Sequence, residues 1–349
     1  MTTPPARYVD QVAAAVLPLS ALNQAIINDL DPEAGGISWW AHLDRARRIL
    51  IGDYLIQLSD STQLNLVEAV MHLELARHLW TEAGDELRTT GVRLTRRLTP
   101  AMEDRAVEES SHVVGFFRAL GSVFDNLAGL TIGVAGLRVA LLRAPYSHLR
   151  VTKNSPGGTL PECTAGRNEQ IALHTAIKAA LDKYPAGWDQ WVIDMRNMLV
   201  HRARRMNWVY PDGRRTDLVM RPLPARPSST DVEAMSGSGG HEHETLHESA
   251  DTTMAGALDA TVHLVQATAS AAVHLWSRRR ASPDLIVQPA EQWPKLTKGD
   301  GNCFVGWQPG TLPTDVKSIH LNPDTATRFA AAHLLDERRD QWQDQPRPT

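Results

Sequence analysis

The 349-residue chain contains only two cysteines, Cys163 and Cys303, and they stand far apart in the sequence. Two isolated cysteines provide neither a disulfide framework nor a zinc site built from a cysteine cluster. A hydrophobic core must therefore stabilise the fold, and a hydrophobic content of 42% is sufficient for that in a chain of this length. Because disulfides are rare in reducing compartments, the low cysteine content fits a cytoplasmic location.

The sequence also lacks a secretory signal and a long uninterrupted hydrophobic run. Its start, "MTTPPARYVD", has neither the charged beginning nor the apolar stretch of a signal peptide. The most apolar segment, Leu127–Leu142, contains Arg138 and is shorter than the roughly 20 residues that span a bilayer. We interpret this segment as a buried helix and expect no membrane partner.

The chain has no strong overall charge, since its formal net charge is −4. A polyanion can therefore be attracted only by a local cluster. Residues 196–226 provide one, with eight arginines and two aspartates, a balance of +6. An alternative interpretation is a solvated basic face that pairs with the acidic N-terminal half. The candidate RNA-binding residues are Arg202, Arg204, Arg205, Arg214 and Arg215.

Apolar residues recur with a period near 3.6 through most of the chain, which predicts an all-α fold. We expect a helical bundle with a short β-hairpin insertion and a small irregular C-terminal module. The predicted regions are an N-terminal helical region at 1–109, a bundle at 110–281 and the C-terminal module at 282–349. A hairpin and a flexible linker, at about 207–248, interrupt the bundle before a last long helix at about 250–279.

Glycine and proline indicate where the helices begin, end and pack. Gly84 resembles a turn residue, and Pro100 marks a boundary between two helical segments. Gly129, Gly133 and Gly136 are spaced as small residues that let another helix approach closely. Glycine inside a helix costs about 1 kcal/mol relative to alanine, so tight packing is the expected compensation.

The segment "DMRNMLVHRARR", Asp194–Arg205, combines an apolar helical face with a polar stripe. At about 100° per residue, Arg196 points into the apolar side, while Asn197 and His201 lie on the polar stripe. A desolvated guanidinium needs an acid or an anion beside it. One interpretation is therefore structural: Arg196 pairs with an acid of a neighbouring helix, such as Asp125.

The hexapeptide "RNMLVH" is similar to the Arg-Asn-x-x-x-His motif of the HEPN superfamily, the higher eukaryotes and prokaryotes nucleotide-binding domains. The resemblance covers about ten residues in a helical context. It implies a dimerising helical bundle that brings two copies of the motif into one cleft and cleaves RNA without a metal or other cofactor. Arg196 and His201 match the defining positions, and Asn197 matches a common polar position. Arg202 and Ala203 follow the histidine, where the family often has Gly-Tyr.

These residue types suit RNA cleavage. A neutral His201 can accept the proton of the 2′-hydroxyl, since histidine has a reference pKa of about 6.5. Arg196 can stabilise the charge that develops on the phosphate, and Asn197 can orient the imidazole or bind the RNA backbone. Arg196 and His201 lie about 140° apart on a regular helix, so we expect a homodimer to complete the site.

What the resemblance further implies is a toxin or defence effector restrained by an antitoxin or another regulatory protein. The main alternative is a catalytically silent helical binding or regulatory protein. A weaker one is a zinc-dependent hydrolase, because His243, Glu244 and His247 formally match the His-Glu-x-x-His pattern. The sequence before this pattern is Ser-Gly-Ser-Gly-Gly-His-Glu rather than apolar, which favours a linker that leads into the last helix.

Overall fold

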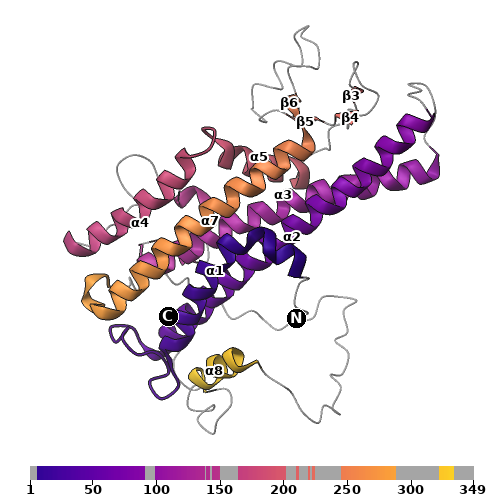
Figure 1. The fold of residues 1–349 in the computed structure, drawn as a ribbon. Coiled ribbons are helices and arrows are strands. Elements are labelled where there is room, and N and C mark those ends of the chain that lie inside the picture. The colour runs from indigo at the N-terminus through magenta and orange to yellow at the C-terminus, as the bar shows by residue number, and fades with distance from the viewer. Residues whose placement is uncertain are drawn as a thin grey trace, which may run out of the picture.

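The computed structural model confirms an all-α fold, a helical bundle that carries short antiparallel strand pairs (Figure 1). It describes residues 6–90, 99–137, 139–141, 144–149, 164–201, 210–211, 219–220, 222–224, 245–287 and 322–333. The α-helices in this part of the chain are α1 (Ala6–Asp29), α2 (Arg45–Thr90), α3 (Pro100–Ala135), α4 (Thr164–Asp182), α5 (Trp188–His201), α7 (Ala250–Ala281) and α8 (Pro323–Ala331).

Helices α2 and α3 form a long antiparallel hairpin, and α2 alone has 46 residues, about 69 Å. Gly84 lies inside α2 and is not a turn, because the helix continues for six residues beyond it. Two glycines of α3 let the helices approach closely. A Cβ on Gly129 would lie 2.9 Å from Leu58 Cδ1, and one on Gly133 would lie 2.4 Å from Leu55 Cδ2. This close approach confirms the packing role predicted for both.

Helix α3 ends at Ala135, seven residues before the end of the apolar segment. Gly136 takes the left-handed conformation with φ 61°, and its N–H donates to the carbonyls of Gly133 and Ile132. The N–H of Leu137 donates to Ile132 O at 3.1 Å. Such a pattern terminates a helix by satisfying its last carbonyls, and glycine adopts it without strain. The prediction of Gly136 as a helix-interior glycine is therefore wrong.

The starts of α3 and α7 are specified locally. Thr99 caps α3 by accepting a hydrogen bond from the N–H of Met102 at 3.3 Å, and Pro100, predicted as a boundary, takes the first helical position. Ser249 caps α7 by accepting from the N–H of Thr252 at 3.1 Å. The predicted last helix is thus confirmed with nearly the expected limits.

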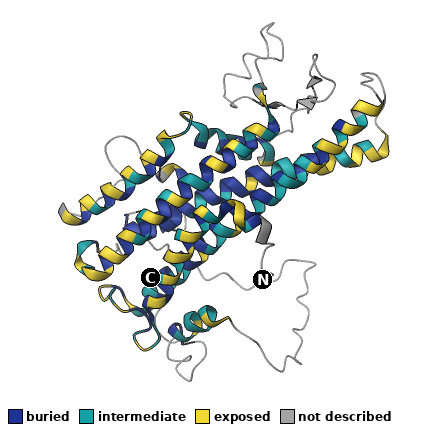
Figure 2. Cartoon of the chain, in the orientation of Figure 1, coloured by how far each residue is buried: buried dark blue, intermediate teal, exposed yellow. Residues whose placement is uncertain are grey.

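One hydrophobic core joins the helices. α7 contacts α1, α4 and α3, and the core includes buried residues from both halves of the chain, for example Leu22, Leu55, Phe124 and Leu264. Figure 2 shows the buried residues along the inner faces of these helices. The predicted limit between residues 109 and 110 falls inside α3, so a single helix runs across it.

In the described part of the chain, three short strand pairs accompany the helices. β1 (Leu30–Asp31) pairs with β2 (Gly36–Ile37) directly after α1, in a region where we predicted only helix. β3 (Tyr210–Pro211) pairs with β4 (Val219–Met220), which confirms the predicted hairpin. β5 (Pro222–Pro224) pairs with β6 (Thr245–Ser249), so the two ends of the predicted linker lie side by side. Residues 225–244 between them lie outside the described residues.

The end of α7 is anchored by its arginines. Arg279 is fully buried, and its guanidinium donates to the carbonyls of Val134, Gly133 and Ile286 at 2.6, 3.3 and 3.3 Å. It also lies 5.8 and 5.6 Å from the ring centroids of Trp39 and Trp40. Burial lowers the pKa of Arg279 to about 9, which leaves it charged at neutral pH.

The arginines on either side of Arg279 form ion pairs. Arg278 Nε lies 3.0 Å from Glu169 Oε1 of α4. Arg280 Nε lies 2.9 Å from Asp29 Oδ1, and the other oxygen of Asp29 accepts from Trp276 Nε1 at 2.8 Å. The three arginines at the end of α7 therefore hold this helix against α1, α3 and α4.

The C-terminal part that the structure describes contains α8, which confirms a short helix in the predicted module. Arg328 contacts Asp53 of α2 through Nη2 at 2.5 Å and Nε at 2.6 Å. α8 also contacts α1 and β1. The residues of the predicted module around α8, 288–321 and 334–349, lie outside the described part.

Among the described helices, α3 alone is long and apolar enough to cross a membrane, judged by length and composition. In this structure 61% of its most apolar window is buried inside the bundle. A core helix that is mostly buried passes the same test, and α3 packs in this way against α2, α5 and α7.

Candidate functional site

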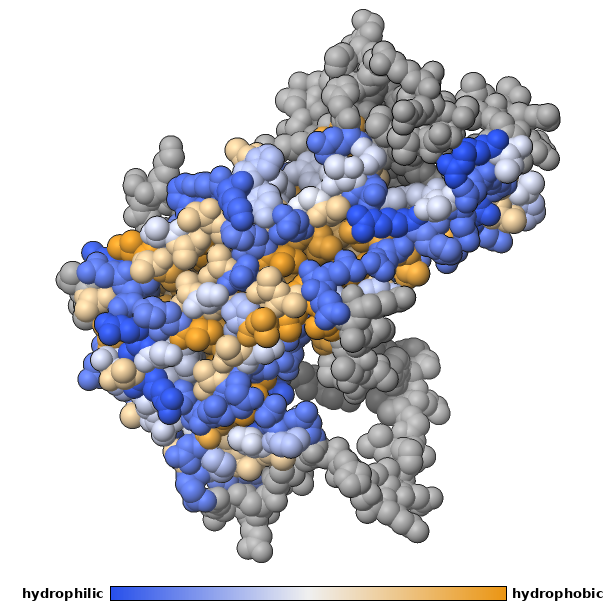
Figure 3. All heavy atoms as spheres, viewed as in Figure 1, coloured by the Kyte–Doolittle hydropathy of each residue, from blue (hydrophilic) through white to orange (hydrophobic). Residues whose placement is uncertain are grey.

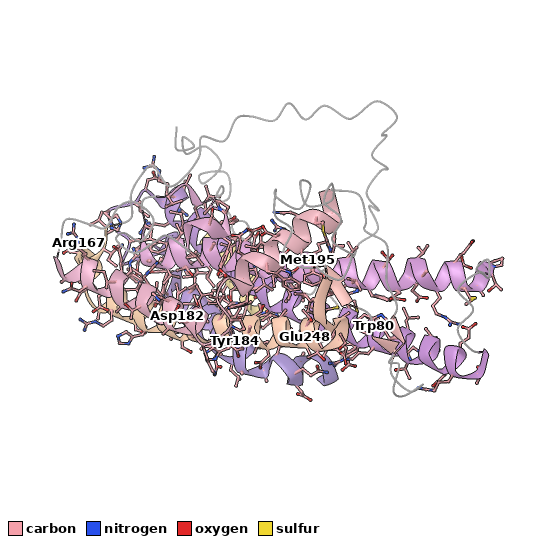
Figure 4. The ribbon with its side chains drawn as sticks, turned by 90° about the horizontal axis from the view of Figure 1, so that it is seen from above. Trp80, Arg167, Asp182, Tyr184, Met195 and Glu248 are labelled. Atoms are coloured by element: carbon pink, nitrogen blue, oxygen red, sulfur yellow. The ribbon has the colours of Figure 1, made fainter. Side chains whose placement is uncertain are left out.

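Helix α5 presents the candidate motif, and its buried face fixes the position of the motif on α3. Val192, Met195 and Met198 are buried at intervals of three residues, and the ring of Trp191 packs edge-on against Phe117 of α3 at 5.5 Å. Figure 4 shows Met195 on α5 where this helix lies against the bundle. Val200, one of the residues of the apolar face predicted for the segment Asp194–Arg205, is 45% exposed. The buried stripe is thus narrower than predicted.

Arg196 pairs with Asp125 of α3, as the structural interpretation predicted. Arg196 Nη1 lies 2.7 Å from Asp125 Oδ2. The side chains are 24% and 42% exposed, so the pair lies at the edge of the α3–α5 contact. Partial exposure matters because water and other anions can compete for such a guanidinium.

Gly121 makes this ion pair possible. A Cβ at Gly121 would lie 2.3 Å from Arg196 Cδ and 3.0 Å from its Nε. Because such a distance to Cδ is too short for any carbon, the side chain of Arg196 crosses α3 only where Cβ is missing. We did not predict this role from the sequence. The available signal was a glycine inside an apolar helix, one turn before the aspartate.

Asn197 binds the arginine beside it. Its Oδ1 accepts from Arg196 Nε at 3.3 Å and from Arg196 Nη2 at 3.2 Å. The prediction that Asn197 orients the imidazole is not tested, since the side chain of His201 lies outside the described part. In the described geometry, Asn197 and Asp125 together fix the plane of the guanidinium.

A second layer of contacts connects Asp125 to the start of α5. The backbone N–H of Tyr146, in the short 3-10 helix η2 (Tyr146–His148), donates to Asp125 Oδ1 at 3.3 Å. The hydroxyl of Tyr146 donates to Asp189 Oδ2 at 3.0 Å, and both residues are buried. Asp189 lies in the first turn of α5, where a carboxylate is favoured by the helix dipole. Tyr146 therefore links the partner of Arg196 to the beginning of the helix that carries it.

His201 is the last residue of α5. Its backbone is placed one and a half turns after Arg196, and the structure does not describe its side chain. The five candidate RNA-binding arginines, Arg202, Arg204, Arg205, Arg214 and Arg215, also lie outside the described residues. The structure thus brings Arg196 and Asn197 together, while the roles of His201 and of the basic segment stay predictions.

The alternative metal motif does not lie on a helix where the structure describes it. Residues 245–249, which include His247, form strand β6, while His243 and Glu244 lie outside the described residues. The zinc-protease pattern needs both histidines on adjacent turns of one helix. Within the described part of the chain, no group of three or more His, Cys, Asp or Glu side chains is arranged to hold a metal ion.

Comparison of the chain with protein-family models, with curated proteins and with solved structures finds no match. The fold places the protein in the class of all-α bundles, with α3 as the central helix. Its candidate site is Arg196 of α5, whose side chain packs over Gly121 of α3 and pairs with Asp125 of the same helix.

Proposed function

We propose that the protein is a metal-independent endoribonuclease of the HEPN type, in which Arg196 stabilises the scissile phosphate and His201 acts as the general base. The observation that carries this proposal is the placement of Arg196. Its guanidinium is oriented by Asp125 and Asn197, is partly exposed, and lies on the helix that ends at His201.

The guanidinium retains donors for a ligand. An arginine has five N–H groups, and within the described residues Arg196 uses three of them, on Nε, Nη1 and Nη2. Its remaining N–H groups can donate to phosphate oxygens. A fixed plane reduces the entropy lost when a planar, two-pronged contact with phosphate forms.

The sequence around the motif supports binding of a polyanion. Arg202, Arg204 and Arg205 follow His201 directly, and the whole segment 196–226 has a charge balance of +6. Neutralising phosphates releases condensed counterions, so the affinity for RNA should fall steeply with salt concentration.

We further propose that two copies of the chain complete the site. On a regular helix, Arg196 and His201 point about 140° apart, so one protomer does not present both groups to the same phosphate. A homodimer that juxtaposes the two α5 helices would supply the arginine from one copy and the histidine from the other. A toxin or defence role in the cytoplasm, under an antitoxin-like regulator, follows from the family resemblance.

A second candidate is a catalytically silent binding or regulatory protein with the same fold. The ion pair favours it, because Asp125 already neutralises Arg196 and its carboxylate repels an approaching phosphate. In that case the Gly121–Asp125–Arg196 arrangement serves only to attach α5 to α3.

Cleavage assays separate the two candidates. Purified protein is incubated with a mixed-sequence RNA in EDTA, beside Arg196→Ala and His201→Ala variants. Arg278→Ala and His78→Ala serve as matched controls, since these side chains are 55% and 68% exposed and lie outside the motif. We expect cleavage to 2′,3′-cyclic phosphate ends, lost by about 10²-fold or more in the motif variants and unchanged in the controls. Equal cleavage by all five proteins, or none by any, would overturn the proposal.

A further inference from the structure

The α2–α3 hairpin extends beyond the rest of the bundle as a projecting arm, formed by the C-terminal end of α2 and the beginning of α3 (Figure 1). Arg77 of α2 contacts Asp251 at the start of α7 at 2.5 Å, near the place where the arm leaves the bundle. Figure 3 shows mainly hydrophilic residues over the projecting end. The contacts between α2 and α3 therefore determine how the arm is attached to the bundle.

Two histidines meet across the hairpin just inside this point. His72 Nδ1 of α2 lies 3.0 Å from His112 Nδ1 of α3, and the two ring centroids are 5.3 Å apart. The side chain of His72 is 15% exposed. A Cβ on Gly115 would lie 2.4 Å from His72 Nε2, so a glycine is needed where this ring packs on α3.

This contact is a hydrogen bond only when one Nδ1 has a proton and the other has a free lone pair. Glu68 Oε1 lies 3.6 Å from His72 Nε2 and favours a proton on that nitrogen, which leaves Nδ1 of His72 as the acceptor. His112 is then the donor. A first added proton, on His112 Nε2, preserves the bond, whereas a second proton, on His72 Nδ1, removes the acceptor and sets two cations against each other.

We propose that the His72–His112 pair is a proton-operated clamp at the base of the arm, closed when at most one of the two rings is charged and opened when both are charged. The pair lies on the α2–α3 contact, whereas Arg196 lies on the α3–α5 contact. The proposal therefore does not rest on the proposed nuclease activity.

The surroundings of the pair make His72 resist protonation. Burial is the largest cause that lowers its pKa below 6.5, and His112 and Arg118 of α3 lower it further. Glu68, on the same helix as His72, raises it and forms an ion pair with Arg118. Because the pKa of His72 is lower in the folded than in the unfolded state, the unfolded state binds more protons below about pH 6.5. The clamp should therefore be stable above that pH and weaken as the pH falls.

Thermal unfolding of the full chain between pH 7.5 and pH 5.0 tests the clamp. The double variant His72→Gln/His112→Gln retains one donor and one acceptor but does not titrate. His78→Gln is the matched control, because His78 lies on the same helix, is 68% exposed and pairs with Glu82. We expect Tm to fall by about 3 °C more in the wild type and in the control than in the double variant. Equal falls in all three proteins would overturn the proposal.

Histidine NMR signals of the wild-type protein give a second readout that needs no folded variant. We expect the ring of His72 to bind its second proton below pH 6.5, because burial lowers its pKa. Amide exchange, corrected for its intrinsic pH dependence, should increase near residues 72 and 112 as that proton binds. A His72 titration at or above pH 6.5, without a change in amide exchange, would show that the contact is no clamp.

Discussion

Arg279 and Arg196 both pack against helix α3, but their environments are opposite. Arg279 of α7 is fully buried, and its guanidinium contacts backbone carbonyls and two tryptophan rings. Arg196 of α5 is 24% exposed and is held by the carboxylate of Asp125 and the amide of Asn197. Each arginine contacts a glycine of α3: Arg279 donates to the carbonyl of Gly133, and the side chain of Arg196 packs over Gly121.

The difference separates an arginine that stabilises the fold from one that is available to a ligand. Two of the three carbonyls around Arg279, those of Gly133 and Val134, belong to the last turn of α3, where carbonyls lack the regular helical partner four residues ahead, so this guanidinium helps to satisfy the helix end. Arg196 instead pairs at a solvent-accessible edge, where an ion pair contributes little to stability. Mutations at the two places should therefore separate stability from function.

Arg279→Met should have the largest effect. The variant loses the hydrogen bonds to Gly133, Val134 and Ile286 and leaves their carbonyls buried, which we expect to lower the free energy of unfolding by about 3 kcal/mol. Urea unfolding followed by circular dichroism measures this loss. Arg278→Gln, which breaks only an exposed pair with Glu169, should cost less than about 1 kcal/mol. Similar losses in both variants would show that burial of Arg279 is not decisive.

Gly121→Ala should affect the site more than the fold. The new Cβ would overlap Arg196 Cδ, so the guanidinium must leave its place between Asp125 and Asn197. We expect RNA cleavage to fall at least about tenfold, while Tm changes by less than about 3 °C because a long side chain can move away. Gly84→Ala is the matched control, since a Cβ there meets nothing within 4 Å. It should leave cleavage unchanged.

Asp125→Asn should have a small effect on stability. The single amide oxygen can still accept from Arg196 Nη1, but the variant loses the negative charge and the long hydrogen bond from the Tyr146 N–H, which together should cost about 1–2 kcal/mol because the ion pair is half-exposed. Urea unfolding at low and high salt measures it, and we expect the difference from wild type to shrink at high salt. Glu169→Gln, in the pair with Arg278, is the comparison. If the free energy of unfolding fell by more than about 3 kcal/mol and salt did not reduce this loss, the Asp125–Arg196 pair would behave as a buried interaction, like those of Arg279.

Gly84→Ala by itself should give the smallest change, and a stabilising one. Alanine is favoured over glycine inside a helix by up to about 1 kcal/mol, and the space around Gly84 is open. A small rise in Tm is therefore expected. Gly133→Ala should instead destabilise by about 1–3 kcal/mol, because its Cβ would lie 2.4 Å from Leu55 Cδ2.

Several features were predictable because their causes are local in sequence. The boundary at Pro100 and the hairpin formed by β3 and β4 each depend on residues that are close together in the sequence. The periodicity that defines α7 lies within one segment. The pairing of Arg196 with Asp125 could also be predicted. A guanidinium on an apolar helix face requires an acid, and Asp125 lies in another apolar helical segment.

Other features depend on distant contacts and were missed. Gly84 and Gly136 look alike in sequence, yet one lies inside α2 and the other ends α3, because the available partners decide whether the helix continues. The pairing of β5 with β6 joins two ends of a segment without apolar periodicity. The role of Gly121 requires knowing which side chain of α5 crosses α3 at that level.

The sequence alone determined an all-α bundle, a boundary at Pro100, the last helix α7 and the Arg-Asn-x-x-x-His pattern at 196–201, because periodicity, helix boundaries and short motifs act over a few residues. Only the tertiary structure decided that Arg196 is oriented by Asp125 and Asn197 across Gly121, that Arg279 closes the end of α3, and that His72 meets His112. These contacts join residues 40 to 146 positions apart, together with the neighbouring pair Arg196 and Asn197. Their energies depend on distance, burial and available space, which are set only when the helices pack.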